Sequence, residues 1–343
     1  MKALRFAVSG RFSQKDIIVS LLRGFLALCI VSLAPLVSAS EDYPSRPLKV
    51  VAPMAAGGGT DTDTVARLFA QKMSARLAQP VIVENRAGAG GQIGTEIVAS
   101  AAPDGYTLLF ASSSTLTLPY LRKTRFELLR DFVPVGQVGV GGFVLVVSPK
   151  LPLRTLAEFL TAAKANPGKY TFGSPGVGSA GHLGLHLLKA KSGIEMVHVP
   201  FKSSTEVAQA LISGQIDSAI DIVPIQKPYI DAQSVRALAT TGSVRDANLP
   251  SLPTFNESGL VPGGYELTFW YGMFVPRATP APVVQRVQRE FATVMKDPEV
   301  EQRVKAFSLE PSKLSADGFA KNIASDTAMW RKVIEDNKIV VND

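Results

Sequence analysis

The chain alternates between short runs of apolar, mostly β-branched residues and longer segments in which apolar residues recur at helical spacing. Apolar runs at 48–52, 81–84 and 106–111 predict buried strands of a parallel sheet. Between the first two runs, the spacing of Val65, Phe69 and their neighbours predicts a helix that packs on this sheet. Such an alternation is typical of the α/β class.

Two longer apolar runs, 141–147 and 265–275, are interpreted as strands that cross between two domains. Between and after them, the same pattern predicts further strands and helices. The strands are expected near 169–172, 196–202, 218–220 and 236–240, and the helices near 156–165, 183–188, 203–214, 283–295 and 319–337.

Length and charge narrow the class of protein. A chain of 343 residues with 46% hydrophobic residues can form two domains. Its formal charge is +7, but residues 1–39 hold a net +4 of this, which leaves +3 for the rest. Because the remainder is only mildly basic, no nucleic-acid partner is expected.

Residues 1–39 have the layout of a signal peptide. A basic start precedes an apolar run at 25–31, and small residues precede a cleavage site after Ala39. A permanent membrane anchor is the alternative, but Ser32 and Pro35 interrupt the run before it reaches a spanning length. The only cysteine, Cys29, follows Leu28, which disfavours a lipoprotein. We therefore expect a secreted, periplasmic protein without thiols.

The stretch 50–67 is interpreted as a seat for an anion. A predicted strand ends at Pro53, and Gly57, Gly58 and Gly59 precede a helical pattern. Glycines let successive N–H groups converge on a bound oxygen, and the N-terminus of the helix adds its dipole. A glycine-rich turn without a ligand is an equal alternative.

A second seat is expected at 173–182, where another predicted strand leads through glycines and hydroxyls into a helix. Two seats that face each other across a cleft would hold a small anion from both sides. Ser112 and Ser113, at the carboxyl end of a predicted strand, are further candidates for ligand contact, because open α/β sheets bind ligands at that edge. An ordinary polar loop is the alternative.

Several other motifs favour weaker interpretations. Gly176, Gly178 and Gly181 match a dinucleotide fingerprint, but Glu195 stands before the next strand rather than at its end. No serine here has the flanking glycines of a hydrolase nucleophile. His182 and His186 have the spacing of a zinc pair, yet loop support and packing are the preferred roles, so no metal is expected.

Asp217 and Asp221 flank a predicted strand and are candidates to accept hydrogen bonds from a ligand. Loop capping is the alternative role, and a paired-carboxylate hydrolase is disfavoured.

From 43 to about 332, the chain resembles the solute receptors of tripartite tricarboxylate transporters, the Bug family of periplasmic binding proteins. The order and spacing of the matching segments together carry the resemblance. These segments are 53–61, 83–91, 102–109, 176–183, 199–202, 214–217 and 270–272. The resemblance implies two α/β domains joined by crossing strands, with carboxylates held in the cleft by backbone amides, hydroxyls and bridging waters.

The family's binding positions carry over residue by residue. The first loop corresponds to Pro53, Met54, Ala55, Ala56, Gly57 and Gly58, the second to Ser179 with Gly178 and Ala180, and the acidic strand end to Asp217 or Asp221. This sequence departs from the family at three places. Met54 replaces a usual aromatic residue, two extra residues fall between Gly59 and Arg67, and Ser203 replaces a usual glycine. The first two departures change the wall of the first seat, whereas Ser203 is expected to cap a helix.

Together these observations predict a two-lobed periplasmic binding protein of the type II-like α/β class, each lobe a mixed sheet flanked by helices, with two crossing strands as hinge. Residues 43–143 plus 268–343 are expected to form lobe I, and 144–267 lobe II. The expected function is to capture a small organic acid, with no cofactor and no catalysis, as a monomer that serves membrane transporter subunits. A sensory receptor for the same ligands, serving a sensor protein, and a dinucleotide-dependent oxidoreductase are the alternatives.

Overall fold

The computed structural model describes residues 43–54 and 61–341, with backbone only for residues 61 and 62. The chain divides into two units, 1–43 and 44–343, and the fold below is that of the second. The predicted signal peptide and the residues Ala55, Ala56, Gly57 and Gly58 of the first seat lie outside the described residues.

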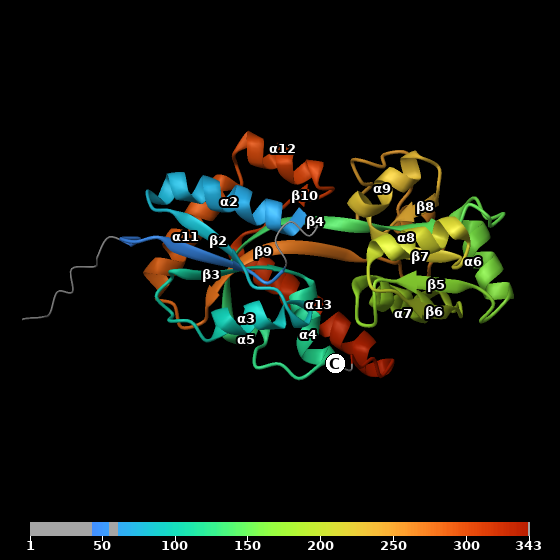
Figure 1. Cartoon of the computed structure of the whole chain (residues 1–343), viewed down its shortest axis with the longest axis horizontal. Helices are drawn as coiled ribbons and strands as arrows, with labels where there is room; N and C mark the ends of the chain where they lie inside the picture. The colour runs from blue at the N-terminus through green and yellow to red at the C-terminus, as the bar shows by residue number, and fades with distance from the viewer. Residues whose placement is uncertain (1–42, 55–60, 342–343) are drawn as a thin grey trace, which may run out of the picture. The chain divides into compact units, whose positions relative to one another are not determined.

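The strands form one continuous path in the order β2-β1-β3-β9-β4-β7-β5-β6, with β8 and β10 also paired to β4. Figure 1 shows β4 and β9 running through the middle of this unit. The strands are β1 (Leu48–Ala52), β2 (Val81–Asn85), β3 (Thr107–Ser112), β4 (Phe132–Val147), β5 (Thr171–Ser174), β6 (Val197–Pro200), β7 (Ser218–Ile222), β8 (Arg236–Thr240), β9 (Thr268–Pro276) and β10 (Glu310–Pro311).

The long strand β4 belongs to both halves of the sheet. From Phe132 to Gly142 it pairs antiparallel with β9, and from Phe143 to Val147 it pairs with β7 and β8. We call β1, β2, β3, β9, β10 and the first part of β4 sheet A, and β5 to β8 with the second part of β4 sheet B. The predicted strand at 141–147 therefore covers only the end of β4, which begins at Phe132.

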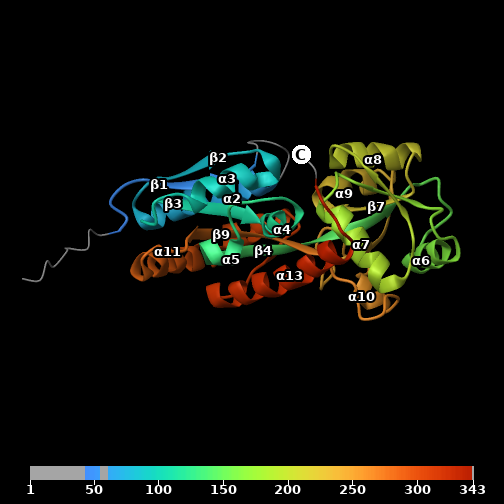
Figure 2. The ribbon, with the colours of Figure 1, turned by 90° about the horizontal axis from the view of Figure 1, so that it is seen from below.

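Helices flank both sheets, α11 and α13 against sheet A and α7, α8 and α9 against sheet B (Figures 1 and 2). The helices are α2 (Asp61–Leu77), η1 (Ala89–Gly91), α3 (Gln92–Ala99), α4 (Ser114–Leu121), α5 (Leu128–Asp131), α6 (Leu156–Ala165), α7 (Ala180–Ser192), α8 (Ser204–Ser213), α9 (Val223–Asp231), α10 (Phe255–Ser258), α11 (Ala281–Val294), α12 (Pro298–Ala306) and α13 (Ala316–Asp336). In the described ranges, no helix combines the length and apolarity needed to cross a bilayer.

Aromatic side chains hold the C-terminal helices on sheet A. The rings of Phe69 in α2 and Phe291 in α11 stack with centroids 5.0 Å apart. On α13, Phe319 meets the indole of Trp270 edge to face at 5.0 Å, and both residues are almost fully buried. Because such pairs add to the stabilisation from burial, α11 and α13 pack stably on the sheet that contains β1 to β3.

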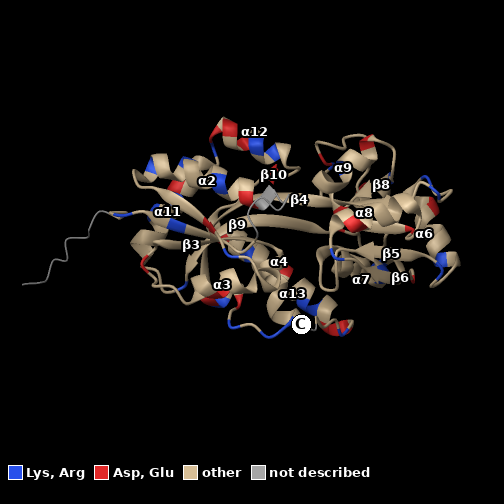
Figure 3. Ribbon diagram, in the orientation of Figure 1, with Lys and Arg blue, Asp and Glu red and all other residues tan. Residues whose placement is uncertain are grey.

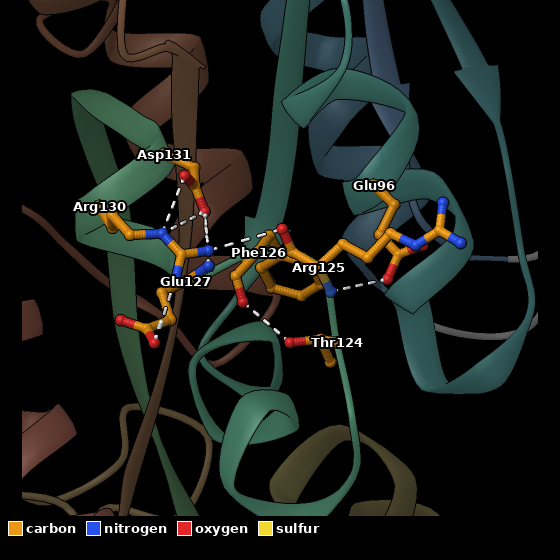
Figure 4. A network of polar contacts seen from close by, with 7 residues as sticks. All are labelled: Glu96, Thr124, Arg125, Phe126, Glu127, Arg130 and Asp131. Atoms are coloured by element: carbon orange, nitrogen blue, oxygen red, sulfur yellow. Dashed lines mark hydrogen bonds and ion pairs between the residues drawn. The ribbon is translucent and has the colours of Figure 1, made fainter.

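A polar network fixes the turn that leads into β4 (Figure 4). The Asp131 carboxylate accepts hydrogen bonds from the Arg130 guanidinium at 2.7 Å and from the Glu127 N–H at 2.7 Å. Next to it, the Arg125 N–H donates to Glu96 of α3 at 3.1 Å. The network therefore joins the start of β4 to the helix that follows β2.

Charged residues of both signs are interspersed along the surface helices (Figure 3). On α12, acidic residues occupy the first turn and basic residues the last, the arrangement that complements a helix dipole. On α13, Arg331 and Lys332 each pair with an acidic residue four positions later.

Candidate functional site

The carboxyl ends of the parallel strands β1, β2 and β3 meet at one edge of sheet A, where a cavity of about 320 Å³ opens. We call this cavity the first half-site. Its lining residues are Pro53, Met54, Ala87, Gly88, Gly90, Gly91, Ser112, Ser114 and Thr115. None of these residues carries an ionisable side chain, so a ligand there meets backbone dipoles, hydroxyls and apolar atoms.

Two helices begin at this cavity without a side-chain cap. The N-cap of α3 is Gly91, which has a φ of 103° and no side chain, and the N-cap of α4 is Ser113, whose hydroxyl makes no cap hydrogen bond. Ser114 and Thr115, the first two residues of α4, line the cavity, and N–H groups at these positions have no partner within a helix. The first N–H of α3, that of Gln92, donates to the Ala89 carbonyl, so the free N–H groups at the cavity come from α4, while the dipoles of both helices favour an anion there.

Close packing of α3 against the end of β1 shapes one wall of the first half-site. A Cβ built on Gly94 of α3 would lie 2.8 Å from the Pro53 Cα and 2.7 Å from the Arg86 carbonyl oxygen. Only glycine allows this helix to approach the end of β1 so closely. Behind the wall, the Asn85 amide donates to Asp63 at 2.8 Å and accepts from Arg67 at 2.8 Å, which ties α2 to the end of β2.

The second predicted seat, residues 174–182, forms the turn between β5 and α7, and we call it the second half-site. The Ser179 hydroxyl caps α7 by accepting from the His182 N–H at 3.3 Å, and it donates to the Gly176 carbonyl at 2.7 Å. The Gly178 N–H donates to Nδ1 of His182 at 3.1 Å. Ser179 and Gly178 thus hold the turn, whereas the N–H groups of Ala180 and Gly181 begin the helix and have no intrahelical partner.

All three histidines of the chain lie close together, and one of them, His182, contacts this turn. The ring centroids of His182 and His198 are 4.2 Å apart, and those of His182 and His186 are 4.8 Å apart. His198 bonds the Ser174 hydroxyl at 2.7 Å, and His186 bonds Asn337 at 2.9 Å. The predicted loop support by His182 is confirmed. In the described part of the chain, no group of three or more His, Cys, Asp or Glu side chains could hold a metal ion.

Burial lowers the pKa of His182 and of His198 to about 4 each, and the neighbouring histidines add a smaller repulsion in the same direction. Both rings are therefore neutral near pH 7. This protonation state matters for the turn, because Nδ1 of His182 accepts a hydrogen bond only when it carries no proton.

The two candidate aspartates, Asp217 and Asp221, lie at opposite ends of strand β7. Asp217 precedes β7, and its carboxylate accepts from the N–H of Thr171 at 2.7 Å and from the Thr171 hydroxyl at 2.9 Å. Since β5 and β7 are parallel, this is the end of β5 away from the second half-site. The structure therefore does not bring Asp217 together with Ser179, and Asp217 instead fixes the start of β5.

Asp221 lies near the carboxyl end of β7, on the same edge as the second half-site, and is only 4% exposed. It accepts from the Ile222 N–H at 2.8 Å and from the Gln226 amide at 3.3 Å. Burial raises the pKa of this carboxyl group, and hydrogen bonds from Ser204, Ile222 and Gln226 oppose the rise. Asp221 is thus a buried hydrogen-bonding group at the edge of sheet B that carries the second half-site.

Helix α4 connects the two half-sites. Its first residues line the first half-site, and at its other end Leu121 accepts a hydrogen bond from the Val341 N–H at 3.1 Å. A Cβ on Gly178 would lie 2.7 Å from Val341 and 3.1 Å from Leu121, so the turn of the second half-site packs on this end. None of the described residues lining the first half-site comes from 174–182, and residues 55–60 lie outside the described ranges.

Of the predicted site residues, Pro53, Met54 and Ser112 line the first half-site, and Ser113 is the N-cap beside it. The sequence did not indicate that α4 forms, that the loop at 87–91 lines the cavity, or that Ser174 pairs with His198. A signal for α4 exists: hydroxyl residues that directly precede an apolar run are a typical helix start.

Residues 65–339 match the family described as "Tripartite tricarboxylate transporter family receptor". A protein from the tcbD-tcbE intergenic region of Pseudomonas sp. (strain P51) is 35% identical over 92% of this chain and 94% of its own length. The protein BugT of Bordetella pertussis is 32% identical over 87% of this chain and 91% of its own length.

Solved structures show the same fold. Rpa4515 of R. palustris, solved with adipate, has a TM-score of 0.74 at 29% identity and matches 88% of this chain and 100% of its own. MatC from Rhodopseudomonas palustris, solved with bound malate, has a TM-score of 0.68 at 29% identity and matches 85% and 100%. The periplasmic binding protein BugD has a TM-score of 0.70 at 32% identity and matches 87% and 99%.

The predicted fold class, a two-lobed α/β periplasmic binding protein, is confirmed by these neighbours. Because the family consists of solute receptors, the oxidoreductase alternative is set aside. The chain belongs to the tripartite tricarboxylate transporter receptor family, the TctC and Bug solute-binding proteins.

Proposed function

We propose that this protein captures a small organic acid, a di- or tricarboxylate or a related carboxylate, between its two lobes in the periplasm and delivers it to a membrane transporter. The observation that carries the proposal is the first half-site, where α3 and α4 both begin at a cavity whose described lining residues carry no ionisable side chain. Such a cavity favours a carboxylate through N–H groups and helix dipoles. Relatives solved with adipate and malate support the same ligand class.

We assign the ligand contacts in this proposal to both half-sites. Pro53, Met54, the loop 55–58, Ser112 and the first turn of α4 would hold one carboxylate. The N–H groups at the start of α7, positioned by Gly178 and Ser179, would hold the other end of the ligand. Ligand binding then favours the closed state, in which lobe I (43–143 plus 268–343) and lobe II (144–267) come together. The reason is that the ligand gains its second set of contacts only on closure.

Residue Ser114 offers a sharp test of the first half-site. Ser114→Asp places a negative charge at the first position of α4, where an aspartate is favourable for the helix itself. The variant is therefore expected to fold normally but to bind carboxylates at least about tenfold more weakly, since about 1.4 kcal/mol of repulsion suffices for that loss. Ser114→Asn, which is similar in shape but neutral, is the matched control.

The measurement is isothermal titration calorimetry with adipate, malate, citrate and a panel of amino acids and aromatic acids, with thermal unfolding as a second readout. The proposal is wrong if no acid binds, or if Ser114→Asp and Ser114→Asn bind equally well. A receptor for transport and a receptor for sensing would bind the same ligand. They are separated by deleting the gene and comparing uptake of the radiolabelled acid with transcription of genes that the acid induces.

A further inference from the structure

The residues that follow α13 lie beside the second half-site, and we call residues 337–341 the strap segment. Helix α13 contacts both α4, which begins at the first half-site, and α7, which begins at the second (Figure 2). The N–H of Ile339 donates to the Ile334 carbonyl at 3.0 Å, and the Ile339 side chain is buried. The strap segment is therefore packed against α13 before it reaches the turn of the second half-site.

Val341 contacts elements of both sheets. Its N–H donates to the Leu121 carbonyl at the end of α4 at 3.1 Å. Its Cγ2 methyl group lies where a Cβ on Gly178 would be only 2.7 Å away, so the methyl group packs directly on the backbone of the turn. Because α4 packs on β3 of sheet A and Gly178 follows β5 of sheet B, Val341 bridges the two sheets.

A polar contact makes the same connection at the start of the strap segment. Asn337 donates from Nδ2 to the Val333 carbonyl at 2.9 Å, which leaves its Oδ1 as an acceptor. His186 of α7 bonds this Oδ1 through Nδ1 at 2.9 Å, so Nδ1 of His186 carries the proton. The His186 ring in turn meets the ring of His182, which accepts the Gly178 N–H at 3.1 Å. Asn337 therefore supports the turn through two histidines.

Both contacts act on the part of sheet B that carries the free N–H groups of α7. Gly178 and Ser179 directly precede Ala180 and Gly181, whose N–H groups have no intrahelical partner. A turn that is free to move has to be ordered when a ligand binds, and this ordering weakens the affinity. A turn already held by the strap segment avoids that cost.

We propose that the strap segment positions the second half-site for its ligand, with Val341 and Asn337 as the positioning residues. This inference rests on the proposed function, since it concerns the half-site assigned there to the second end of the ligand. A dicarboxylate uses both half-sites, whereas a monocarboxylate of equal length places its one carboxylate in the first. Loosening the strap segment therefore weakens the binding of dicarboxylates selectively.

Two variants loosen the strap segment in different ways. Val341→Gly removes the methyl groups that pack on Gly178. Its matched control is Val340→Gly, which removes the same side chain from the preceding position, where valine is 61% exposed. His186→Phe keeps an aromatic ring beside His182 but removes the bond to Asn337. Thermal unfolding shows that each variant is folded at the temperature of the binding experiment.

Calorimetry compares adipate with hexanoate and malate with 3-hydroxybutyrate. In Val341→Gly and in His186→Phe, the dicarboxylate that the parent chain binds is expected to bind at least about tenfold more weakly. The matching monocarboxylate keeps its affinity within about twofold, and Val340→Gly binds both acids as the parent does. A general loss of stability does not produce this split, because it affects both acids alike.

Hydrogen exchange without ligand tests the strap segment independently of the proposed function. The amides of 176–182 should exchange faster in Val341→Gly and in His186→Phe than in the parent chain, whereas those of α9 keep the parental rate. The inference is overturned if both variants keep the parental exchange at 176–182, or if the two kinds of acid lose affinity equally. A parent chain that binds none of these acids contradicts the proposed function, and hydrogen exchange alone then decides on the strap segment.

Discussion

The side chain of Thr241 accepts a hydrogen bond from the backbone N–H of Phe143 at 2.8 Å, and the Thr241 N–H donates back to the Phe143 carbonyl at 2.8 Å. The same hydroxyl donates to the Leu267 carbonyl at 2.5 Å, and the Leu267 N–H donates to the Thr241 carbonyl at 3.0 Å. Thr241 is fully buried. One residue therefore joins β4, at its change of partners, to the segment that leads into β9.

Thr241→Val is expected to lower the free energy of unfolding by about 1–3 kcal/mol, because it leaves the Phe143 N–H and the Leu267 carbonyl without partners. Thr240→Val is the matched control. The Thr240 hydroxyl is buried and has no hydrogen-bond partner within 43–54 and 61–341, so its removal should leave stability unchanged or raise it. Urea unfolding at neutral pH measures both variants, and equal losses would show that the Thr241 hydroxyl has no special part in the hinge.

Gly94→Ala is expected to destabilise the protein by about 1–3 kcal/mol and to weaken carboxylate binding, because the added methyl group overlaps Pro53 and the Arg86 carbonyl. Gly318→Ala in α13 is the control: its Cβ meets nothing closer than 3.4 Å. That variant should gain up to about 1 kcal/mol, since alanine is the better helix former. Thermal unfolding and calorimetry test the pair, and a neutral Gly94→Ala would exclude close packing of α3 as a determinant of the first half-site.

Stability should fall as the pH drops from about 6.5 towards 4. His182 and His198 have their pKa lowered to about 4 by burial, whereas the unfolded chain takes up protons near pH 6.5. The contribution of these two histidines to folding stability is therefore complete above pH 6.5, where both are neutral. It is lost progressively as the pH falls below 6.5.

The groups that face these rings are His186, the Ser174 hydroxyl and the Gly178 N–H. In His198→Gln, urea unfolding at pH 7.5 and pH 5 should differ less than in the parent chain. A parent chain whose stability is flat between these pH values would contradict the neutral state of the two histidines.

Asp131→Asn is expected to lower stability by about 1 kcal/mol at pH 7 and to have little effect near pH 3. The Arg130 guanidinium beside Asp131 and the Glu127 N–H hold the pKa of this carboxyl group below its usual value, and burial opposes them. Its stabilisation is thus present above the usual pKa of an aspartate and disappears as the pH falls through the lowered value.

Glu335→Gln, at an exposed position in the last turn of α13, is the control for the loss of one charge in Asp131→Asn. Chemical unfolding at both pH values provides the comparison. A loss that persists at pH 3 would assign the effect to geometry rather than to charge.

The hydrophobic pattern predicted most strands and the long amphipathic helices. The helix at 156–165 and the strand at 236–240 lie where the spacing placed them. These elements are bounded by clear turn residues, and one face or the whole run is buried, so the pattern carries the needed information.

Three elements that the pattern did not predict, the first part of β4, α4 and α9, contain residues that usually interrupt structure. The first part of β4 includes Pro134, Gly136 and Gly139, and the strand accommodates them through irregularities in its pairing with β9. Helix α4 contains Pro119, and α9 contains Pro224 and Pro228. At these positions tertiary packing overrides local preference.

For the site, the sequence placed Pro53, Met54 and Ser112 correctly at one strand edge, because the carboxyl ends of consecutive parallel strands coincide. The sequence also placed Asp217 before the strand around 218–220 and Asp221 at its other end. It did not show that this strand pairs with β5 in parallel, which puts Asp217 at the end of β5 away from the second half-site.

The position of β9 between β3 and β4 decides when the protein can acquire its structure. The strand that closes sheet A is made of residues 268–276, whereas its two neighbours end at residues 112 and 147. A polypeptide that emerges from its amino end therefore exposes the open edge of β3 until more than four-fifths of the chain has been delivered. The first half-site, at the end of β3, therefore lies beside a complete sheet A only after that point, and until then β3 offers an unpaired edge at which other chains can pair.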